Sequence, residues 1–312
     1  MKDLLHQPVL YKEIIHALQP RNPGRYIDGT VGAGGHARGI LEACAPDGRL
    51  LGLDLDPQAL ALARETLAPY ERRAVLVQAS FLTLLEAMRA LGWDSADGIV
   101  LDLGVSSMQL DAPERGFSFL QEAPLDMRFD PQHGMSAAEL VNSYGQEELA
   151  DILFRYGEEP RARRIASSIV HARPVRTTKE LADIVRRSYP GHSRMHPATR
   201  TFQALRIAVN DELAALEKVL PRAVQALRPG GRLAVISFHS LEDRIVKEFF
   251  RSESKDRVNP PHERIYEVER RATLREVNRK PITPAAEEIE ANPRARSAKL
   301  RVAEKMQSTV DS

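Results

Sequence analysis

The chain has 312 residues, 43% of them hydrophobic, which is enough for one large domain or two modest ones with an ordinary core. Its formal net charge is only +1, so no global field selects an acidic or a basic partner. Cys44 is the single cysteine, which excludes an intramolecular disulfide framework and is typical of a reducing compartment. Charged residues interrupt the N-terminal stretch and no apolar run reaches membrane-spanning length, so we expect a cytoplasmic protein without a membrane partner.

Strand-like apolar runs alternate with helical segments along the chain. The runs are Tyr26–Ile27, Arg49–Asp56, Ala74–Gln78, Gly98–Gly104 and, much later, Gly231–Phe238. Runs of Val, Ile and Leu that alternate with helices indicate a parallel sheet covered on both faces. The predicted fold class is therefore α/β, with a doubly wound, mostly parallel sheet. Because the alternation stops and later resumes, we expect a discontinuous domain, residues 1–106 and 211–312, with a mostly helical insertion over residues 107–210.

The insertion carries an excess of positive charge. Residues 155–210 contain twelve Lys or Arg against four Asp or Glu, a balance of +8, and the rest of the chain therefore sums to −7. A basic surface on one subdomain is the expected footprint of an RNA-binding face, although a solvated helical face gives the same count. The candidate RNA contacts are Arg161, Arg163, Arg164, Arg186, Arg187 and Arg206.

One predicted helix of the insertion, residues 198–210, has two distinct faces. Phe202, Leu205 and Val209 form an apolar stripe. The opposite face is polar, and it includes Arg206 and Asn210. That polar face either meets RNA or is an ordinary exposed helix surface.

A glycine-rich turn, DGTVGAGGH at residues 28–36, joins the first strand to a helix. Such turns bind anions and polar ligands through free backbone N–H groups and the helix dipole. The turn lacks the Gly-Lys-Ser/Thr ending of a P-loop, which excludes that class. It matches the G-x-G-x-x-G/A spacing of dinucleotide-binding folds, and Asp54 ends the second strand, where an acid accepts ribose hydroxyls. That acid suits a nicotinamide cofactor and S-adenosylmethionine equally.

Asp28, at the entrance of the turn, bears on this choice. A carboxylate there would repel a pyrophosphate, whereas S-adenosylmethionine has no phosphate and carries a sulfonium and an ammonium group. The turn therefore favours S-adenosylmethionine over a dinucleotide, with a purely structural turn as a third interpretation. We also expect Asp28 to accept hydrogen bonds from N–H groups of the turn.

Several longer blocks resemble one known family. With GGH at 34–36, they are DLGVSS at 102–107, ERGFSF at 114–119, PLDMR at 124–128, HPATRTFQALRIAVN at 196–210, SFHSLEDRIVK at 237–247 and NPRARSAKLR at 292–301. In order and over nearly the whole chain, they resemble the family of bacterial 16S rRNA cytosine-N4 methyltransferases, RsmH (MraW). The resemblance implies a class I (Rossmann-like) methyltransferase fold, with an inserted helical domain that recognises RNA.

The resemblance also implies an activity and a set of cofactor contacts. The cofactor is S-adenosylmethionine, and the partner is 16S rRNA in the small ribosomal subunit or its precursor. The implied reaction methylates the exocyclic N4 amine of a cytidine in the decoding region. The implied cofactor contacts are Gly34, Gly35 and His36 in the turn, Asp54 at the ribose, Phe81 at the adenine, and Asp102 and Gln109 at the methionine end.

The sequence leaves open which group accepts hydrogen bonds from the cytosine amine. Many amino-methyltransferases place Asp/Asn/Ser-Pro-Pro-aromatic at the end of the fourth strand, and this chain has Asp102-Leu-Gly-Val there. The candidates are Asp102, Asp126 and His239. The alternative interpretations are an ion pair with Arg128 for Asp126, and a cap on the helix beginning near Leu241 for His239.

Two other functions stay in competition at this stage. A nicotinamide oxidoreductase would explain the glycine spacing and Asp54, and a noncatalytic ribosome-assembly factor would explain the basic insertion. We predict no metal site. His192 and His196 have helical spacing, but the adjacent Pro190 and Pro197 argue against a regular metal-binding helix.

Overall fold

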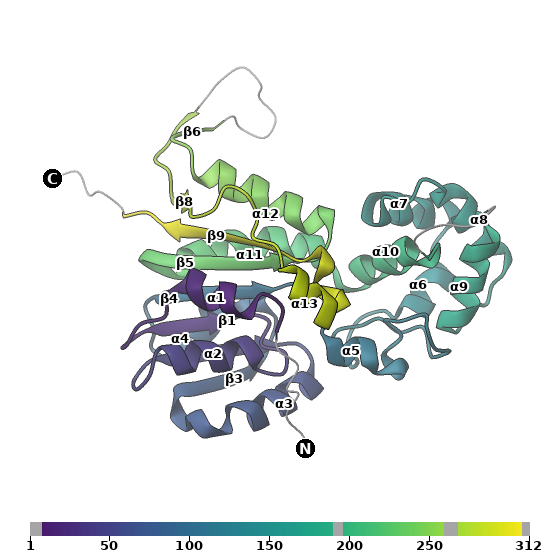
Figure 1. Cartoon of the computed structure of the whole chain (residues 1–312). Helices are drawn as coiled ribbons and strands as arrows, with labels where there is room; N and C mark the ends of the chain where they lie inside the picture. Colours follow the sequence, from purple (N-terminus) through teal and green to yellow (C-terminus); the bar gives the residue numbers. More distant parts are fainter. Residues whose placement is uncertain (1–7, 190–195, 259–267, 308–312) are drawn as a thin grey trace. The chain divides into compact units, whose positions relative to one another are not determined.

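The computed structural model describes residues 8–189, 196–258 and 268–307, and Figure 1 shows it as a ribbon. The chain divides into two compact units. The first consists of residues 1–104 and 214–312, and the second consists of residues 105–213. The sequence predicted the breaks after residue 106 and after residue 210. The functions predicted for the two units are taken up below as proposals.

The first unit contains a seven-stranded sheet with the strand order β3-β2-β1-β4-β5-β9-β8. The strands are β1 (Arg25–Asp28), β2 (Arg49–Asp54), β3 (Ala74–Gln78), β4 (Ala96–Asp102), β5 (Leu227–Ser237), β8 (Leu274–Glu276) and β9 (Lys299–Lys305). Strands β1 to β5 pair in parallel, and β9 runs antiparallel to both β5 and β8. This order, with one reversed strand, is that of class I methyltransferases, so the predicted fold class is confirmed.

Helices cover both faces of this sheet (Figure 1). One face packs against α1 (Tyr11–Leu18), α2 (Gly35–Ala43) and α3 (Pro57–Leu67), and the other against α4 (Leu84–Ala90), α11 (Glu212–Ala226) and α12 (Ser240–Glu253). The remaining elements of the unit are η1 (Ala68–Arg73), η2 (Phe81–Thr83), α13 (Ala286–Ala291), η4 (Pro293–Ser297) and the short ribbon of β6 (Arg257–Val258) and β7 (Val268–Glu269).

Two apolar clusters explain why the strands are apolar at consecutive positions. Successive strand residues point to opposite faces, so a strand buried on both faces has no polar alternation. Ile99 of β4 packs with Leu220 and Phe250 on one face, whereas the adjacent Val100 packs with Ile14 and Ile40 on the other. All six of these side chains have an exposed fraction of 1% or less.

The C-terminal strands β8 and β9 were not predicted. Strand β9 pairs on both sides, and Leu300, Val302 and Ala303 are buried in it. Charged residues interrupt its apolar pattern, which hid the strand in the sequence. One of these, Arg301, is only 5% exposed because its guanidinium donates to Asp243 Oδ1 at 2.7 Å.

The second unit is helical after an irregular start, as the sequence predicted. Its elements are α5 (Ser107–Asp111), η3 (Pro113–Arg115), α6 (Ala137–Ser143), α7 (Gln146–Gly157), α8 (Ala162–His171), α9 (Thr178–Arg187) and α10 (Ala198–Asn210). These elements enclose a core of their own, to which Phe202 and Leu205 of α10 contribute. Within the described ranges of both units, no helix is long and apolar enough to cross a membrane.

Candidate active site

The glycine-rich turn leaves β1 at Asp28 and enters α2 at Gly35. Gly32 and Gly34 have φ values of 52° and 86°, in the left-handed region that glycine adopts without a steric penalty. A Cβ atom on Gly34 would also lie 3.2 Å from Leu67 Cγ and 3.4 Å from the Cα of Ala63. The backbone conformation of the turn therefore favours glycine at both positions, and close packing on α3 favours it further at Gly34.

Three carboxylates end three neighbouring strands of the sheet. Asp28 ends β1, Asp54 ends β2 and Asp102 ends β4, and β1 lies between the other two strands. Ligands of open α/β sheets bind beyond the carboxyl ends of the strands. Asp54 also holds the turn, because its Oδ2 accepts from Gly32 N and its Oδ1 from Asp56 N, each at 2.9 Å. Burial raises the pKa of Asp54 above its ordinary value.

Asp28 is the most deeply buried of the three carboxylates, with an exposed fraction of 1%. Burial raises the pKa of Asp28 to about 7, although the charge of His36 and a hydrogen bond from Thr30 N lower it. That hydrogen bond, 3.1 Å from Asp28 Oδ1, confirms that Asp28 accepts from an N–H group of the turn. The predicted repulsion of a pyrophosphate by Asp28 needs correction, because a carboxyl group with this pKa is only partly ionised at neutral pH.

His36 and Asp102 face each other across the mouth of the turn. His36 Nε2 lies 3.7 Å from Asp102 Oδ2, and the ring of His36 stacks on Tyr11 with the ring centres 6.3 Å apart. Among the described residues, neither ring nitrogen of His36 has a hydrogen-bond partner, and neither does Asp102 Oδ1. All three atoms are buried, and an unsatisfied buried polar atom costs about 1–3 kcal/mol. Such atoms are expected where a polar ligand completes the site.

Phe81 and Gln109, the other predicted cofactor contacts, lie in different units. Phe81 begins η2 after β3, is half-buried, and lies against the turn, since a Cβ atom on Gly29 would be 3.2 Å from Phe81 Cβ. Gln109 is buried in α5 of the second unit. It forms a capping box with Ser106, whose N–H donates to Gln109 Oε1 at 3.1 Å. The structure thus gathers Gly34, Gly35, His36, Asp54, Phe81 and Asp102 within one unit.

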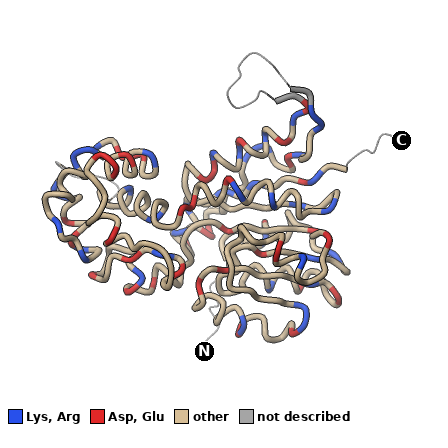
Figure 2. The backbone as a smooth tube through the Cα atoms, turned by 180° about the vertical axis from the view of Figure 1, so that it is seen from behind, with Lys and Arg blue, Asp and Glu red and all other residues tan. Residues whose placement is uncertain are grey.

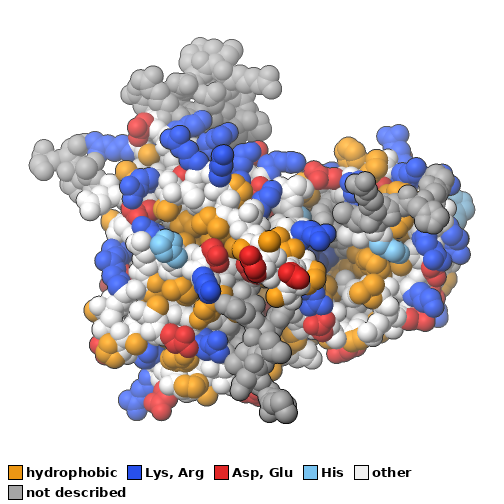
Figure 3. Space-filling model, in the orientation of Figure 1, with side chains coloured by type: hydrophobic (Ala, Val, Ile, Leu, Met, Phe, Trp, Pro, Cys, Tyr) orange, Lys and Arg blue, Asp and Glu red, His pale blue; other side chains and the backbone are white. Residues whose placement is uncertain are grey.

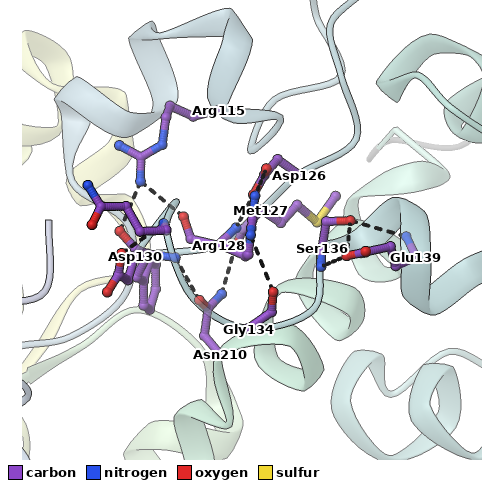
Figure 4. Close-up of polar contacts among 11 residues, drawn as sticks. Arg115, Asp126, Met127, Arg128, Asp130, Gly134, Ser136, Glu139 and Asn210 are labelled. Carbon is purple, nitrogen blue, oxygen red and sulfur yellow. Dashed lines mark hydrogen bonds and ion pairs between the residues drawn. The ribbon is translucent and has the colours of Figure 1, made fainter.

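Asp126 lies in a loop of the second unit and is paired with Arg128, the interpretation that competed with a catalytic role (Figure 4). Arg128 Nη2 donates to Asp126 Oδ2 at 2.7 Å, and Arg128 Nε donates to Oδ1 at 2.9 Å. Burial alone would raise the pKa of Asp126, but the hydrogen bonds and charge of Arg128 outweigh it and hold the pKa below its ordinary value. Asp126 is therefore an ionised group with both oxygens occupied.

The backbone of this loop is held in an unusual conformation (Figure 4). Met127 is fully buried with a φ of 65°, which is a rare value for a bulky residue. Asn210 fixes it, because Nδ2 donates to Met127 O and Oδ1 accepts from Phe129 N, both at 2.7 Å. Arg115 Nη2 donates to the carbonyls of Arg128 and Phe129 at 3.0 Å each. Backbone strain of this kind concentrates at functional sites, and sequence analysis missed both bracing residues.

His239 occupies the cap position of α12, the interpretation that competed with its catalytic role. The N–H of Glu242 points to His239 Nδ1 at 3.4 Å, and the Glu242 carboxylate accepts from the N–H groups of Phe238 and His239. This is a capping box, in which the ring and the carboxylate satisfy the first N–H groups of the helix. The capping box accounts for Nδ1 of His239. Its Nε2 is buried without a hydrogen-bond partner among the described residues and lies 3.1 Å from Glu242 Oε1.

Figure 2 shows where Lys and Arg residues occur along the backbone. The contacts of the predicted RNA-binding arginines divide them into two groups. Arg161 Nη1 donates to Ser188 O at 3.1 Å, and Arg206 forms a two-bond ion pair with Glu212, at 2.7 and 2.8 Å. Both of these side chains brace the second unit. Within the described part of the chain, Arg163, Arg164 and Arg187 are exposed and make no hydrogen bond or ion pair, and the exposed Arg186 pairs with Asp183 at 3.1 Å.

The polar face of α10 is turned to the second unit itself. Gln203 Nε2 donates to Tyr156 O at 3.1 Å, Arg206 pairs with Glu212, and Asn210 holds the Met127 loop. Gln203, Arg206 and Asn210 therefore use their side chains to hold the second unit together. His192, which was weighed as a metal ligand with His196, lies outside the described residues.

Comparison with known proteins identifies the family. The sequence model of the MraW methylase family matches residues 3–306. The chain belongs to the MraW methylase family. The ribosomal RNA small subunit methyltransferase H of Heliobacterium mobile is 52% identical over 308 residues, which cover 96% of this chain and 99% of that protein. The protein of the same name from Lawsonia intracellularis is 50% identical over 310 residues, covering 97% and 99%.

Family membership confirms the resemblance predicted from the sequence blocks. This member of the MraW methylase family is a methyltransferase. The two competing predictions, a nicotinamide oxidoreductase and a noncatalytic ribosome-assembly factor, are therefore wrong. The cofactor of the chain is S-adenosylmethionine, the methyl donor of the class I fold that the strand order shows. An rRNA methylase from Streptococcus thermophilus, a solved structure, has a TM-score of 0.44 at 10% identity and covers 95% of this chain and 94% of its own.

Proposed function

We propose that this chain transfers the methyl group of S-adenosylmethionine to the exocyclic N4 amine of a cytidine in the decoding region of 16S rRNA, in the bacterial cytoplasm. The observation that carries the cofactor assignment is the group of buried polar atoms without partners on His36 and Asp102, beside a turn held by Asp54. The rRNA substrate is supported by the two relatives, whose names describe ribosomal RNA small subunit methyltransferases.

The residues of the first unit suit the chemistry of this cofactor. Bound S-adenosylmethionine would present an electrophilic methyl group on a sulfonium. A carboxylate has about four acceptor positions, and the structure fills two of those of Asp54 with N–H groups of the turn. The remaining positions would accept the ribose hydroxyls. Asp102 Oδ1 and the nitrogens of His36 would meet the methionine end, and Phe81 the adenine.

The geometry favours Asp102 over the other two candidates as the acceptor for the cytosine amine. The N4 lone pair is delocalised into the ring, so the enzyme must orient the amine and accept its hydrogen bonds. Asp102 Oδ1 is an acceptor without a partner among the described residues, whereas both oxygens of Asp126 bind Arg128. His239 uses Nδ1 in the cap of α12, and Asp102 is preferred to it because Asp102 ends a strand at the carboxyl edge of the sheet, beside the glycine-rich turn. We assign Asp126 the role of holding the loop whose strained residue is Met127.

The second unit would supply the RNA-binding surface. A paired or stacked cytidine cannot present its amine to a buried methyl donor, so the base must be splayed out of the RNA. The exposed arginines of α8 and α9 would contact phosphates, which set register and affinity but carry little sequence information. This assignment makes residues 105–213 a substrate domain and the rest of the chain the cofactor domain.

Two measurements test the proposal at separate steps. Calorimetry should show binding of S-adenosylmethionine and none of NAD, and NAD binding alone would overturn the cofactor assignment. Incubation of unmethylated small subunits with labelled S-adenosylmethionine should place the label on cytidine N4. Asp102→Ala should reduce both cofactor affinity and methyl transfer, whereas full methyl transfer by that variant would remove Asp102 from the site.

A further inference from the structure

A cavity of about 300 Å³ lies between α8 and α9, within the second unit. Figure 3 shows Lys and Arg side chains along the outer edge of this unit on the face in view. The residues that line the cavity include Arg164, Ser168, His171, Ile184, Arg187 and Ser188. A volume of this size is at the lower end of the range of small-molecule pockets, about 300–1,000 Å³. None of the lining residues is acidic.

The start of α8 breaks a local rule of helix design. Its cap residue Arg161 makes no side-chain cap bond, and its first turn holds Arg163 and Arg164 without an acidic residue. Positive charges at a helix N-terminus oppose the helix dipole. Local rules of this kind are broken mainly where function requires it. The buried carboxylate of Glu159 offsets part of this positive charge, because it accepts from Arg161 N at 2.9 Å. The guanidinium of Arg164 has no partner of this kind among the described residues.

The floor of the cavity is fixed in advance. Ser188 is 2% exposed, and its Oγ lies 3.1 Å from Ser168 Oγ, which ties α9 to α8. The carbonyl of Ser188 accepts from Arg161 Nη1, whose guanidinium also lies over the ring of Tyr189, 4.8 Å from its centre. A floor that is already ordered leaves little entropy to lose when a ligand binds.

The walls of the cavity carry positive groups that nothing in the described structure neutralises. Arg164 and Arg187 are exposed and without a partner there, in contrast to Arg186, which pairs with Asp183. The ring of His171 also lines the cavity, where its Nδ1 donates to Ser167 O at 2.7 Å. In that neutral tautomer Nε2 is an acceptor and adds no donor for a phosphate oxygen. Guanidinium groups match the geometry of phosphate oxygens with two parallel N–H bonds.

We propose that this cavity binds one phosphodiester of the RNA substrate, held jointly by Arg164 and Arg187. The inference rests on the proposed function and adds to it a defined docking point. It separates the six predicted RNA-contact arginines into three groups. Arg161 and Arg206 brace the fold, Arg164 and Arg187 share one phosphate, and Arg163 and Arg186 lie outside the cavity.

A double-mutant cycle on the full-length protein tests this sharing. We would measure the affinity for unmethylated small subunits at several salt concentrations for Arg164→Gln, Arg187→Gln and the double variant. Each single change should weaken binding roughly tenfold, and the double variant hardly more, because both side chains hold the same phosphate. The slope of log affinity against log salt should fall by about 0.7–0.9, the value for one phosphate contact, in all three variants.

The control substitutions are Arg163→Gln and Arg186→Gln, which lie on the same two helices but outside the cavity. Any effects of these two changes should be smaller and should add in their double variant. Additive losses for Arg164 and Arg187, or an unchanged salt slope, would overturn the shared phosphate. Binding of inorganic phosphate that the variants lose while their RNA affinity stays normal would assign the cavity to a free anion and would also overturn it.

Two further measurements distinguish loss of the phosphate contact from loss of cofactor binding and from failure of the proposed function. Calorimetry with S-adenosylmethionine should give the same affinity for every folded variant, since the cofactor residues belong to the first unit. Methyl transfer by the wild-type protein reports on the proposed function itself. If the wild type methylates the subunits and the cycle is additive, the phosphate cavity is wrong and the proposed function stands.

Discussion

The imidazole of His36 and the carboxylate of Asp102 lie 3.7 Å apart, between Nε2 and Oδ2, at the carboxyl edge of the sheet. Asp102 is anchored from its backbone side, where its N–H donates to Thr30 Oγ1 at 2.6 Å. The turn that follows β1 therefore carries Thr30 and His36, and both contact the residue that ends β4. The two strands are adjacent and parallel, which brings residues 66 positions apart into one site.

Replacement of Asp54 tests the ribose assignment. We expect Asp54→Ala to weaken S-adenosylmethionine binding, because each lost hydrogen bond to a charged acceptor is worth about 1.5–3 kcal/mol. The variant also loses the acceptor for Gly32 N, so part of the effect acts through the turn. Asp94→Ala is the matched control, since Asp94 is an exposed acid of the same unit that precedes β4. Equal cofactor affinities in the two folded variants, measured by calorimetry, would contradict the assignment.

Asp28 should make stability depend on pH. Its pKa of about 7 in the folded protein exceeds the ordinary value of 3.8, so between these values the native state binds a proton that the unfolded chain has released. This contribution is present below about pH 4 and is lost as the pH rises through 7, with a slope of at most about 1.4 kcal/mol per pH unit. We expect Asp28→Asn to remove that slope from the unfolding free energy measured by urea denaturation between pH 4 and 7. An identical slope in wild type and variant would show that Asp28 ionises normally.

Asp126 distinguishes a positioning role from a catalytic one. We expect Asp126→Ala to lower methyl transfer while cofactor affinity is retained, because the ion pair with Arg128 is lost and the Met127 loop loosens. A substitution that can restore the ion pair tests whether its loss causes the drop in methyl transfer. Asp126→Glu should recover part of the activity, and the pH profile of turnover should keep its wild-type shape. Normal methyl transfer by Asp126→Ala would eliminate both roles.

His239 can be tested by a substitution that keeps its cap. Asparagine is among the best N-cap residues, so we expect His239→Asn to retain both stability and methyl transfer. His239→Ala should lower the unfolding free energy by about 0.5–2 kcal/mol, the cost of a lost cap. If His239→Asn unfolds like the wild type and yet transfers no methyl groups, the ring itself takes part in the reaction.

The sheet could be predicted from the sequence where its strands are buried on both faces. The run Ala74–Gln78 was predicted with the bounds that β3 has, because Val and Leu there have no competing helical pattern. Strand β9 was missed since Arg301 and its neighbours look exposed, and only the structure reveals the partner Asp243 that buries the charge. That partner lies 58 positions away.

The site was predictable to a different extent for each residue. The glycines of the turn and the acid at the end of β2 can be recognised from the local sequence, because the glycine spacing indicates a tight strand-to-helix turn. No local sequence pattern points to Asn210, because its contacts with Met127 and Phe129 depend on how α10 packs on a distant loop. The charge count of the insertion treated all arginines alike, whereas the fold occupies Arg161 and Arg206 and leaves Arg164 and Arg187 open.

The most direct test of the central claim is the position of the methyl group on the RNA. Small ribosomal subunits from cells lacking this protein would be incubated with it and isotopically labelled S-adenosylmethionine, and the digested rRNA analysed by mass spectrometry. We expect the label in N4-methylcytidine, at one cytidine of the decoding region, and its loss with Asp102→Ala. Label on a ring carbon or on another base, or no label with wild-type protein that binds the cofactor, would contradict the account.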